Sequence, residues 1–131
     1  MIAFLDTNVV VRHLTGEPVE QARRAKALLA DARRLLLTDL IAAEIVFVLS
    51  SVYGVDRVRI VELLQAVIGF PAVIVLDRML LLRALELYEH TPLHFADAYL
   101  VASAELSGLG AVASFDRAID GVASVRRIES V

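Results

Sequence analysis

Two carboxylates sit where the sequence gives little ordinary reason for an acid. Glu44 is the only charged residue between Leu40 and Gly54, and its neighbours one helical turn away are all apolar. Asp97 lies inside the apolar segment 95–102, although Asp is a poor residue for a helix interior. Neither acid has an Arg or Lys three or four residues away. Because a buried ionised carboxylate is costly unless it is paired or binds a metal ion, both are candidate metal ligands.

Two further acids follow apolar runs that are typical of buried strands. Asp6 ends the run 2–5, and Asp116 follows the run 111–115. Parallel strands present their carboxyl ends at one edge of a sheet, where α/β proteins bind ligands, so these acids are predicted to converge. The chain has no Cys and three His. A donor set made of carboxylate oxygens suits Mg²⁺ or Mn²⁺.

Each acid also has a structural explanation when it is taken alone. Asp6, Thr7 and Asn8 are all good N-cap residues, and a helix is expected to begin there. His94, three residues before Asp97, could pair with that carboxylate. A distant arginine, such as Arg12, could pair with either helical acid.

Helical periodicity and Gly and Pro positions predict strands that alternate with helices. The predicted strands are 2–5, 35–37, 73–76, 111–114 and 126–129; the predicted helices are 8–14, 17–32, 40–49, 57–68, 77–90 and 94–107, with a short turn or helix after residue 116. The strands are continuously apolar, which favours a parallel sheet covered on both faces. We therefore expect one α/β domain over residues 1–131, a three-layer α/β/α sandwich around a central, mainly parallel five-stranded sheet.

Composition restricts the class of protein. The chain is 58% apolar, but its longest charge-free stretch, 63–76, is shorter than the roughly 20 residues that a membrane span needs. No secretory signal is supported at the amino end. We expect a cytoplasmic protein whose apolar excess buries surface against a partner. The net charge of −3 gives no general attraction to nucleic acid, although twelve of the thirteen basic residues are Arg.

These motifs, in this order, resemble the PIN-domain nucleases, particularly the VapC-type toxins of toxin–antitoxin pairs. The resemblance spans nearly the whole chain and rests on the segments 6–8, 97–98 and 114–116 together with Glu44. It implies an acidic metal-binding quartet made of Asp6, Glu44, Asp97 and Asp116. It also implies supporting roles for Asn8, Ser114 and Thr7. Many relatives carry a further acid two residues after the last of the quartet; here that position is Ala118, with Asp120 beyond it.

The resemblance implies a Mg²⁺-dependent endoribonuclease (Mn²⁺ is the alternative metal) that hydrolyses RNA phosphodiester bonds. Asp6 and Asp116 are assigned as direct ligands, and Asp97 as a ligand or a holder of water. Glu44 is assigned to ligate through water or to help deprotonate the attacking water. Arg12 is a candidate contact to the RNA. A VapB-type antitoxin and a second copy of the chain are the implied protein partners.

Two rival functions follow from the same residues. A PIN-domain nuclease of RNA processing or decay would need no antitoxin. A metal-dependent phosphatase or phosphoryl-accepting receiver would need an acid pair near the first strand and a lysine after a later strand, whereas the only lysine here is Lys26. Two apolar faces are candidates for the partner surfaces, and ordinary core packing explains each of them equally well: 80, 81, 85 and 88 form the first, and 58, 61 and 64 form the second.

Overall fold

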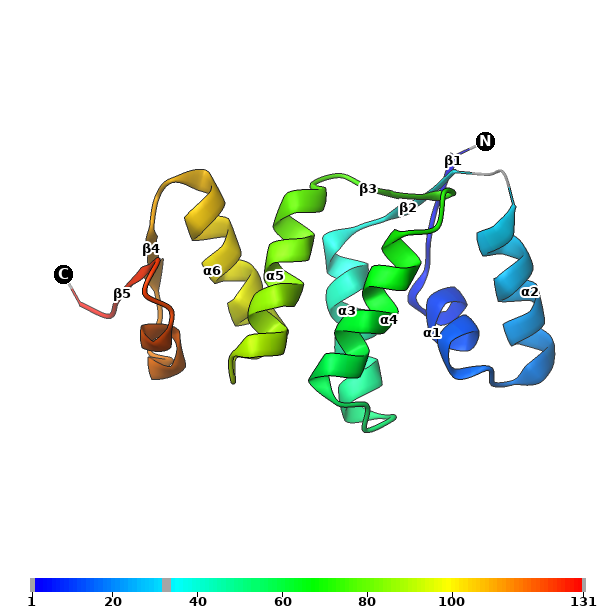
Figure 1. Cartoon of the computed structure of the whole chain (residues 1–131), viewed down its shortest axis with the longest axis horizontal. Helices are drawn as coiled ribbons and strands as arrows, with labels where there is room; N and C mark the ends of the chain where they lie inside the picture. The colour runs from blue at the N-terminus through cyan, green and yellow to red at the C-terminus, as the bar shows by residue number, and fades with distance from the viewer. Residues whose placement is uncertain (1, 32–33, 131) are drawn as a thin grey trace. The chain divides into compact units, whose positions relative to one another are not determined.

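The computed structural model describes residues 2–31 and 34–130, which form two compact units, Met1–Leu76 and Asp77–Val131. The first unit contains β1 (Ile2–Phe4), α1 (Thr7–Thr15), α2 (Val19–Ala30), β2 (Arg34–Leu37), α3 (Asp39–Ser51), α4 (Arg57–Ile68) and β3 (Val73–Val75). The second contains α5 (Arg78–His90), α6 (Phe95–Ser107), β4 (Ala111–Ala113), the 3₁₀ helix η1 (Arg117–Gly121) and β5 (Arg126–Ile128). Figure 1 shows these elements along the chain.

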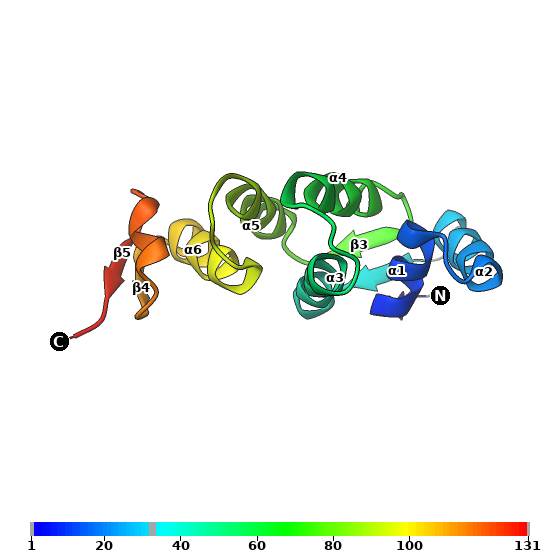
Figure 2. The same ribbon diagram turned by 90° about the horizontal axis from the view of Figure 1, so that it is seen from below.

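The strands of the first unit form a parallel sheet in the order β1-β2-β3. Ala3 pairs in register with Leu35, and Leu36 pairs with Ile74. Parallel neighbours cannot be joined by a tight turn, so each connection passes through a pair of helices. Figures 1 and 2 show α1 between α2 and α3, and α1 packs against both. The carboxyl end of β1 therefore leads directly into a helix that is held on two sides.

Local signals in the sequence set the helix ends of this unit. The Thr38 hydroxyl accepts the Ile41 N–H at 3.2 Å and begins α3, and the Asp56 carboxylate accepts the Arg59 N–H at 2.9 Å and begins α4. Such caps satisfy backbone donors that have no partner within the helix. Gly16 ends α1 with φ of 73°, a left-handed conformation that glycine adopts without steric cost.

The second unit is organised by the packing of α5 against α6. Tyr88 and Phe95 meet edge to face, with ring centroids 6.0 Å apart. The buried residues on these two helices include Leu81, Ala84, Leu85, Leu87, Tyr88, Phe95, Ala98, Val101 and Ala102. β4 and β5 pair in parallel, with Val112 opposite Arg127, and η1 lies between them in the chain. This short crossover carries Asp116 at its start.

The predicted fold class is confirmed, because the described residues form a mixed α/β protein with five parallel strands. Hydrogen bonds join the strands as a group of three in the first unit and a group of two in the second. The predicted elements agree with the observed ones to within a few residues; the predicted end of the second helix, residue 32, lies outside the described residues. The first strand is less buried than its apolar run predicts: Leu5 is buried, but Ile2 and Phe4 are exposed. β1 is an edge strand of its three-stranded sheet.

The two predicted partner faces are wrong as exposed surfaces. Leu81, Leu85 and Tyr88 are buried, as are Val61 and Leu64. Of both sets, only Val58 is exposed, and Leu80 is half-buried. Helical spacing of apolar residues marks a core-facing stripe as readily as a docking surface, and here it marks the core. None of the described helices is both long and apolar enough to cross a membrane.

An ion pair joins the two helices of the second unit. Arg83 on α5 donates to both carboxylate oxygens of Glu105 on α6, at 2.7 and 2.9 Å, and the Ser124 hydroxyl also donates to this carboxylate. The hydrogen bonds from Arg83 lower the pKa of Glu105 despite its burial.

We predict that Glu105→Gln lowers the free energy of unfolding by about 1–3 kcal/mol, because charge-assisted hydrogen bonds are lost. The folded-state pKa of Glu105 is depressed, so its contribution is present above the ordinary Glu value of about 4.3 and is lost as the pH falls below it. Urea denaturation near neutral pH and near pH 3 measures both effects. The control is Glu62→Gln, whose pair with Arg59 is exposed; equal effects of the two substitutions contradict the prediction.

Candidate functional site

Asp6 lies at the N-cap position of α1, immediately after β1 and Leu5. Its backbone is extended, with φ of −90° and ψ of 152°, as a cap requires, but its side chain accepts no capping hydrogen bond. The side chain is exposed. The helix-cap explanation therefore accounts for the backbone of Asp6 and leaves its carboxylate available to a ligand.

Glu44 is brought to the start of α1 by Thr7. Thr7 is buried, and its hydroxyl donates a short hydrogen bond to Oε2 of Glu44 on α3. The two residues are 37 positions apart in the chain, and the packing of α1 against α3 brings them together. Since Thr7 directly follows Asp6, this hydrogen bond holds Glu44 near the start of α1, where Asp6 lies.

Glu44 is exposed, which corrects the expectation that it is buried. It shares one face of α3 with Leu40 and Phe47, which are 78% and 65% exposed. The core-facing residues of α3 lie on the other side of the helix, at Ala42, Ile45, Val46 and Leu49. The sequence could not separate the two faces because both are apolar, so the lack of a polar stripe did not mean that Glu44 was covered.

Asp97 and Asp116 form a pair of carboxyl groups in the second unit. Asp97 lies in the first turn of α6, and Asp116 precedes η1. Burial raises the pKa of Asp97, and the neighbouring Asp116 raises it further through its charge and a hydrogen bond between the two groups. His94 acts in the opposite direction with the smallest contribution, so pairing with His94 does not explain this acid. Asp97 and Asp116 are therefore neighbours, and a bound cation would offset the repulsion between their carboxylates.

The turn that carries Asp116 is fixed by its own polar groups. The Asp116 carboxylate accepts the Ala118 N–H at 2.9 Å, and the Asp116 N–H donates to Oγ of Ser114 at 3.0 Å. Ser114 thus accepts a hydrogen bond from the backbone of Asp116, and its supporting role in the site stays a prediction.

Arg127 holds this turn from β5. Its guanidinium donates to the Ser114 carbonyl at 3.0 Å and to both carboxylate oxygens of Asp120, at 2.9 and 3.1 Å. These bonds from Arg127 lower the pKa of Asp120. The Asp120 carboxylate is engaged with Arg127, and Asp120 therefore differs from the carboxylates of the predicted quartet.

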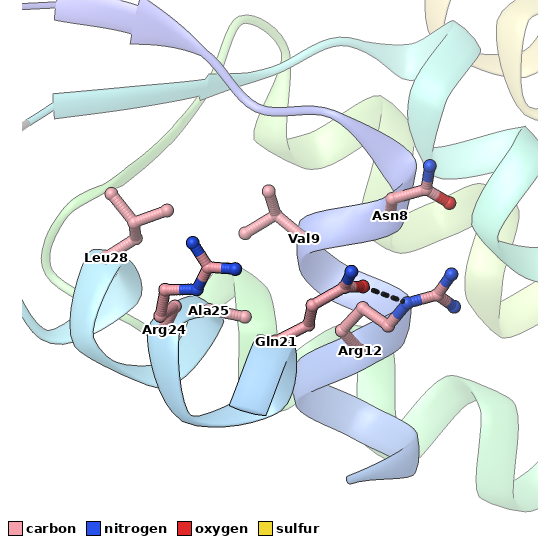
Figure 3. Close-up of a pocket in the computed structure, with 7 residues that line it drawn as sticks. All are labelled: Asn8, Val9, Arg12, Gln21, Arg24, Ala25 and Leu28. Carbon is pink, nitrogen blue, oxygen red and sulfur yellow. Dashed lines mark hydrogen bonds between the residues drawn. The ribbon is translucent and has the colours of Figure 1, made fainter. Parts of the chain in front are cut away.

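Asn8 and Arg12 lie one turn apart on α1 and line a pocket between α1 and α2 (Figure 3). Asn8 is exposed, and Arg12 is half-buried. Arg12 donates from Nε to Oε1 of Gln21 at 2.9 Å. Arg12 therefore interacts with an amide on α2, and its hydrogen bond leaves the two terminal nitrogens of the guanidinium pointing away from that helix (Figure 3).

The predicted quartet is divided between the two units. The first unit brings Glu44 to Thr7, next to Asp6, and the second brings Asp97 to Asp116. Within the described residues of either unit, no group of three or more His, Cys, Asp or Glu side chains gathers to hold a metal ion. The donors of each pair are nevertheless all carboxylate oxygens, and the closeness of Asp97 to Asp116 favours a cation. The chemistry of this donor set fits Mg²⁺ or Mn²⁺.

The sequence assigns no individual role to Arg127, Gln21 or Arg24, although Arg24 and Arg127 belong to arginine pairs that could form positive patches. The arginine pair 126–127 is visible in the sequence, but only the strand register shows which of the two faces the turn. Gln21 and Arg24 lie on a polar helix face, where nothing distinguishes them from solvated residues until α1 and α2 are packed together.

The fold is an α/β architecture in which parallel strands lead into helices and carboxylates follow β1 and β4. Comparison with known families identifies it further: the model of the PIN domain family matches residues 3–125. The chain therefore belongs to the PIN domain family, a family of nucleases.

One solved structure that matches is that of VapBC2 from Rickettsia felis bound to a DNA fragment from their promoter. The match has a TM-score of 0.41 and 14% sequence identity, and it covers 98% of each chain. No curated protein matches the sequence.

We predict that the Thr7–Glu44 hydrogen bond couples α1 to α3 energetically. Thr7→Val and Glu44→Gln should each lower the free energy of unfolding, and their effects should be non-additive by about 0.5–1.5 kcal/mol, because each removes the same bond. Denaturant unfolding of the two single variants and the double variant measures this coupling. Thr15→Val is the control, since the Thr15 hydroxyl donates to the Val11 carbonyl of its own helix. Additive effects of the Thr7 and Glu44 substitutions would argue against the coupling.

Proposed function

We propose that the protein is a Mg²⁺-dependent endoribonuclease of the cytoplasm and the toxin of a VapBC-type toxin–antitoxin pair. In this proposal residues 1–131 act as one nuclease domain, and Asp6, Glu44, Asp97 and Asp116 serve one metal site. The observation that carries the proposal is membership of the PIN domain family together with the acids Asp6 and Asp116, which follow β1 and β4. The proximity of Asp97 to Asp116 also supports the proposal, since neighbouring carboxylates suit a divalent cation.

When bound, Mg²⁺ supplies an activated water and stabilises charge on the reacting phosphate. The protein's own groups then have distinct tasks. Asp116 is held by the Ala118 N–H and Ser114, so its carboxylate is positioned before any ligand arrives. Asp97 completes this pair from α6. Asp6, whose side chain makes no capping bond, provides a carboxylate from the first unit.

Glu44 is the candidate general base of the site. Its carboxylate is exposed, and the buried Thr7 hydroxyl orients one of its oxygens. The second oxygen can accept a proton from an attacking water. Carboxylates positioned in this way act as general bases in hydrolysis.

We predict that Asp6→Asn and Asp97→Asn each lower the rate of RNA cleavage roughly 100-fold or more, since several kcal/mol of charge stabilisation depend on the metal ligands. The assay is cleavage of total RNA with Mg²⁺, and EDTA should abolish it. Asp120→Asn is the control: its carboxylate is already held by Arg127, and we expect less than about a threefold change, on the scale of a lost surface ion pair. Equal cleavage by wild type, Asp6→Asn and Asp97→Asn would overturn the site assignment.

The apolar surface supports a role for protein partners. Among the described residues, six large apolar side chains are more than three-quarters exposed: Phe4, Val19, Leu40, Leu76, Leu109 and Phe115. Exposed apolar area of this kind is typical of surfaces that bind another protein. We propose that a second copy of the chain and a VapB-type antitoxin are these partners.

We predict that the protein is a homodimer at micromolar concentration because association covers part of this apolar surface. Multi-angle light scattering should then give twice the chain mass of 14.3 kDa. A mass of 14.3 kDa across the concentration range would contradict the dimer. Addition of non-ionic detergent at low concentration provides a control for non-specific aggregation.

A further inference from the structure

A pocket of about 270 Å³ lies between α1 and α2 in the first unit. It is lined by Asn8, Val9, Arg12, Gln21, Arg24, Ala25 and Leu28. Figure 3 shows the apolar side chains Val9, Ala25 and Leu28 between the two helices, with polar side chains around them. The pocket therefore combines an apolar floor with a polar rim.

The rim consists of two arginines and two side-chain amides. Arg24 is exposed on α2, and its guanidinium lies between Leu28 and Val9 over the apolar floor (Figure 3). Among the described residues, no carboxylate lies within ion-pair distance of Arg24, whereas its neighbour Arg23 pairs with Glu20 at 2.6 Å. Arg12, fixed by Gln21, adds a second guanidinium to the rim. The lining residues include no acid. The pocket thus carries two guanidinium groups and no acid in its lining, and Glu20 on the same helix acts on Arg24 through its charge alone.

The place of the pocket along α1 links it to the predicted catalytic acid Asp6. Asn8 lies two residues after Asp6, and Arg12 lies one further turn along the helix, a rise of about 6 Å. A chain of nucleotides that places one phosphate at Asp6 and runs along α1 would therefore reach the rim of the pocket at the adjoining nucleotide.

We propose that this pocket is a nucleotide subsite of the RNA-binding surface, in which Arg24 binds a backbone phosphate and the floor of Val9, Ala25 and Leu28 accepts a base. The inference rests on the proposed ribonuclease function and adds a substrate contact to it. A guanidinium fork matches phosphate geometry, and single-stranded RNA is bound by placing bases on apolar side chains and on guanidinium planes. Both kinds of contact are present in the pocket. Arg12 and Asn8 border the same subsite on the side of Asp6.

The test uses binding of a short, fluorescently labelled single-stranded RNA of random sequence, measured by fluorescence anisotropy. All proteins carry Asp97→Asn so that the RNA stays intact. Arg24→Gln should weaken binding roughly ten-fold, because a charge-assisted contact is lost. It should also reduce the slope of log Kd against log salt concentration by about 0.7, the value for one phosphate contact on single strands. A purely structural role for Arg24 would leave this slope unchanged.

Arg23→Gln is the matched control, since it removes the same charge one position away on a side chain that already pairs with Glu20. We expect it to weaken binding less than two-fold. If Arg23→Gln and Arg24→Gln have equal effects, the attraction is a general property of α2 and the subsite is overturned. The subsite is also overturned if the Arg24→Gln variant binds RNA as tightly as the parent protein but no longer binds an acidic peptide or a protein partner.

Crosslinking gives a second measurement that does not depend on the stability of a variant. RNA that contains 4-thiouridine should crosslink to peptides spanning residues 8–12 or 21–28, and crosslinks confined to other peptides count against the subsite. Failure of the ribonuclease proposal is separate: wild-type protein would then leave total RNA intact with Mg²⁺. Wild type that cleaves RNA, together with Arg24→Gln that binds RNA as Arg23→Gln does, would overturn the subsite alone.

Discussion

The predicted metal site depends on the approach of two carboxyl groups, Asp97 on α6 and Asp116 before η1. Burial raises the pKa of Asp97, and the charge of the neighbouring Asp116 raises it further, because two adjacent negative charges repel each other. The Asp116 carboxylate accepts the Ala118 N–H, and the Asp116 N–H donates to Ser114, so the turn keeps Asp116 near Asp97 despite this repulsion. A bound cation would offset the repulsion between the two carboxylates. The mixed α/β fold provides the turn after β4 that holds Asp116 in position.

Much of the fold could be predicted from the sequence because its signals are local. Gly16 and Thr38 mark helix ends through conformation and capping, and apolar runs mark the strands. The acids were found because Asp97 lies in an apolar helix and Asp6 follows an apolar strand. In the structure the Asp6 side chain makes no cap and Asp97 lies near Asp116, and the metal-binding role of both positions stays a prediction.

The remaining features depend on packing, which local pattern does not determine. Glu44 was expected to be buried, but α3 is apolar on both its faces and the core takes only one of them. The same ambiguity misplaced the partner surfaces, since Leu85 and Leu64 are buried. The α1–α2 pocket requires two helices that meet through residues separated in the chain, such as Arg12 and Gln21, and no single segment records that contact.

The pairing of β4 with β5 carries a further consequence. Side chains alternate between the faces of a strand, so Arg127 reaches the Ser114 carbonyl only in the register that places it opposite Val112. A shift of one residue would turn Arg126 toward the turn in its place. The position of Asp116, a predicted metal ligand, therefore depends on how the three-residue strand β5, about ten residues later in the chain, is aligned with β4. Insertions between η1 and β5 are therefore a route by which evolution could tune or silence the acid pair without changing either carboxylate.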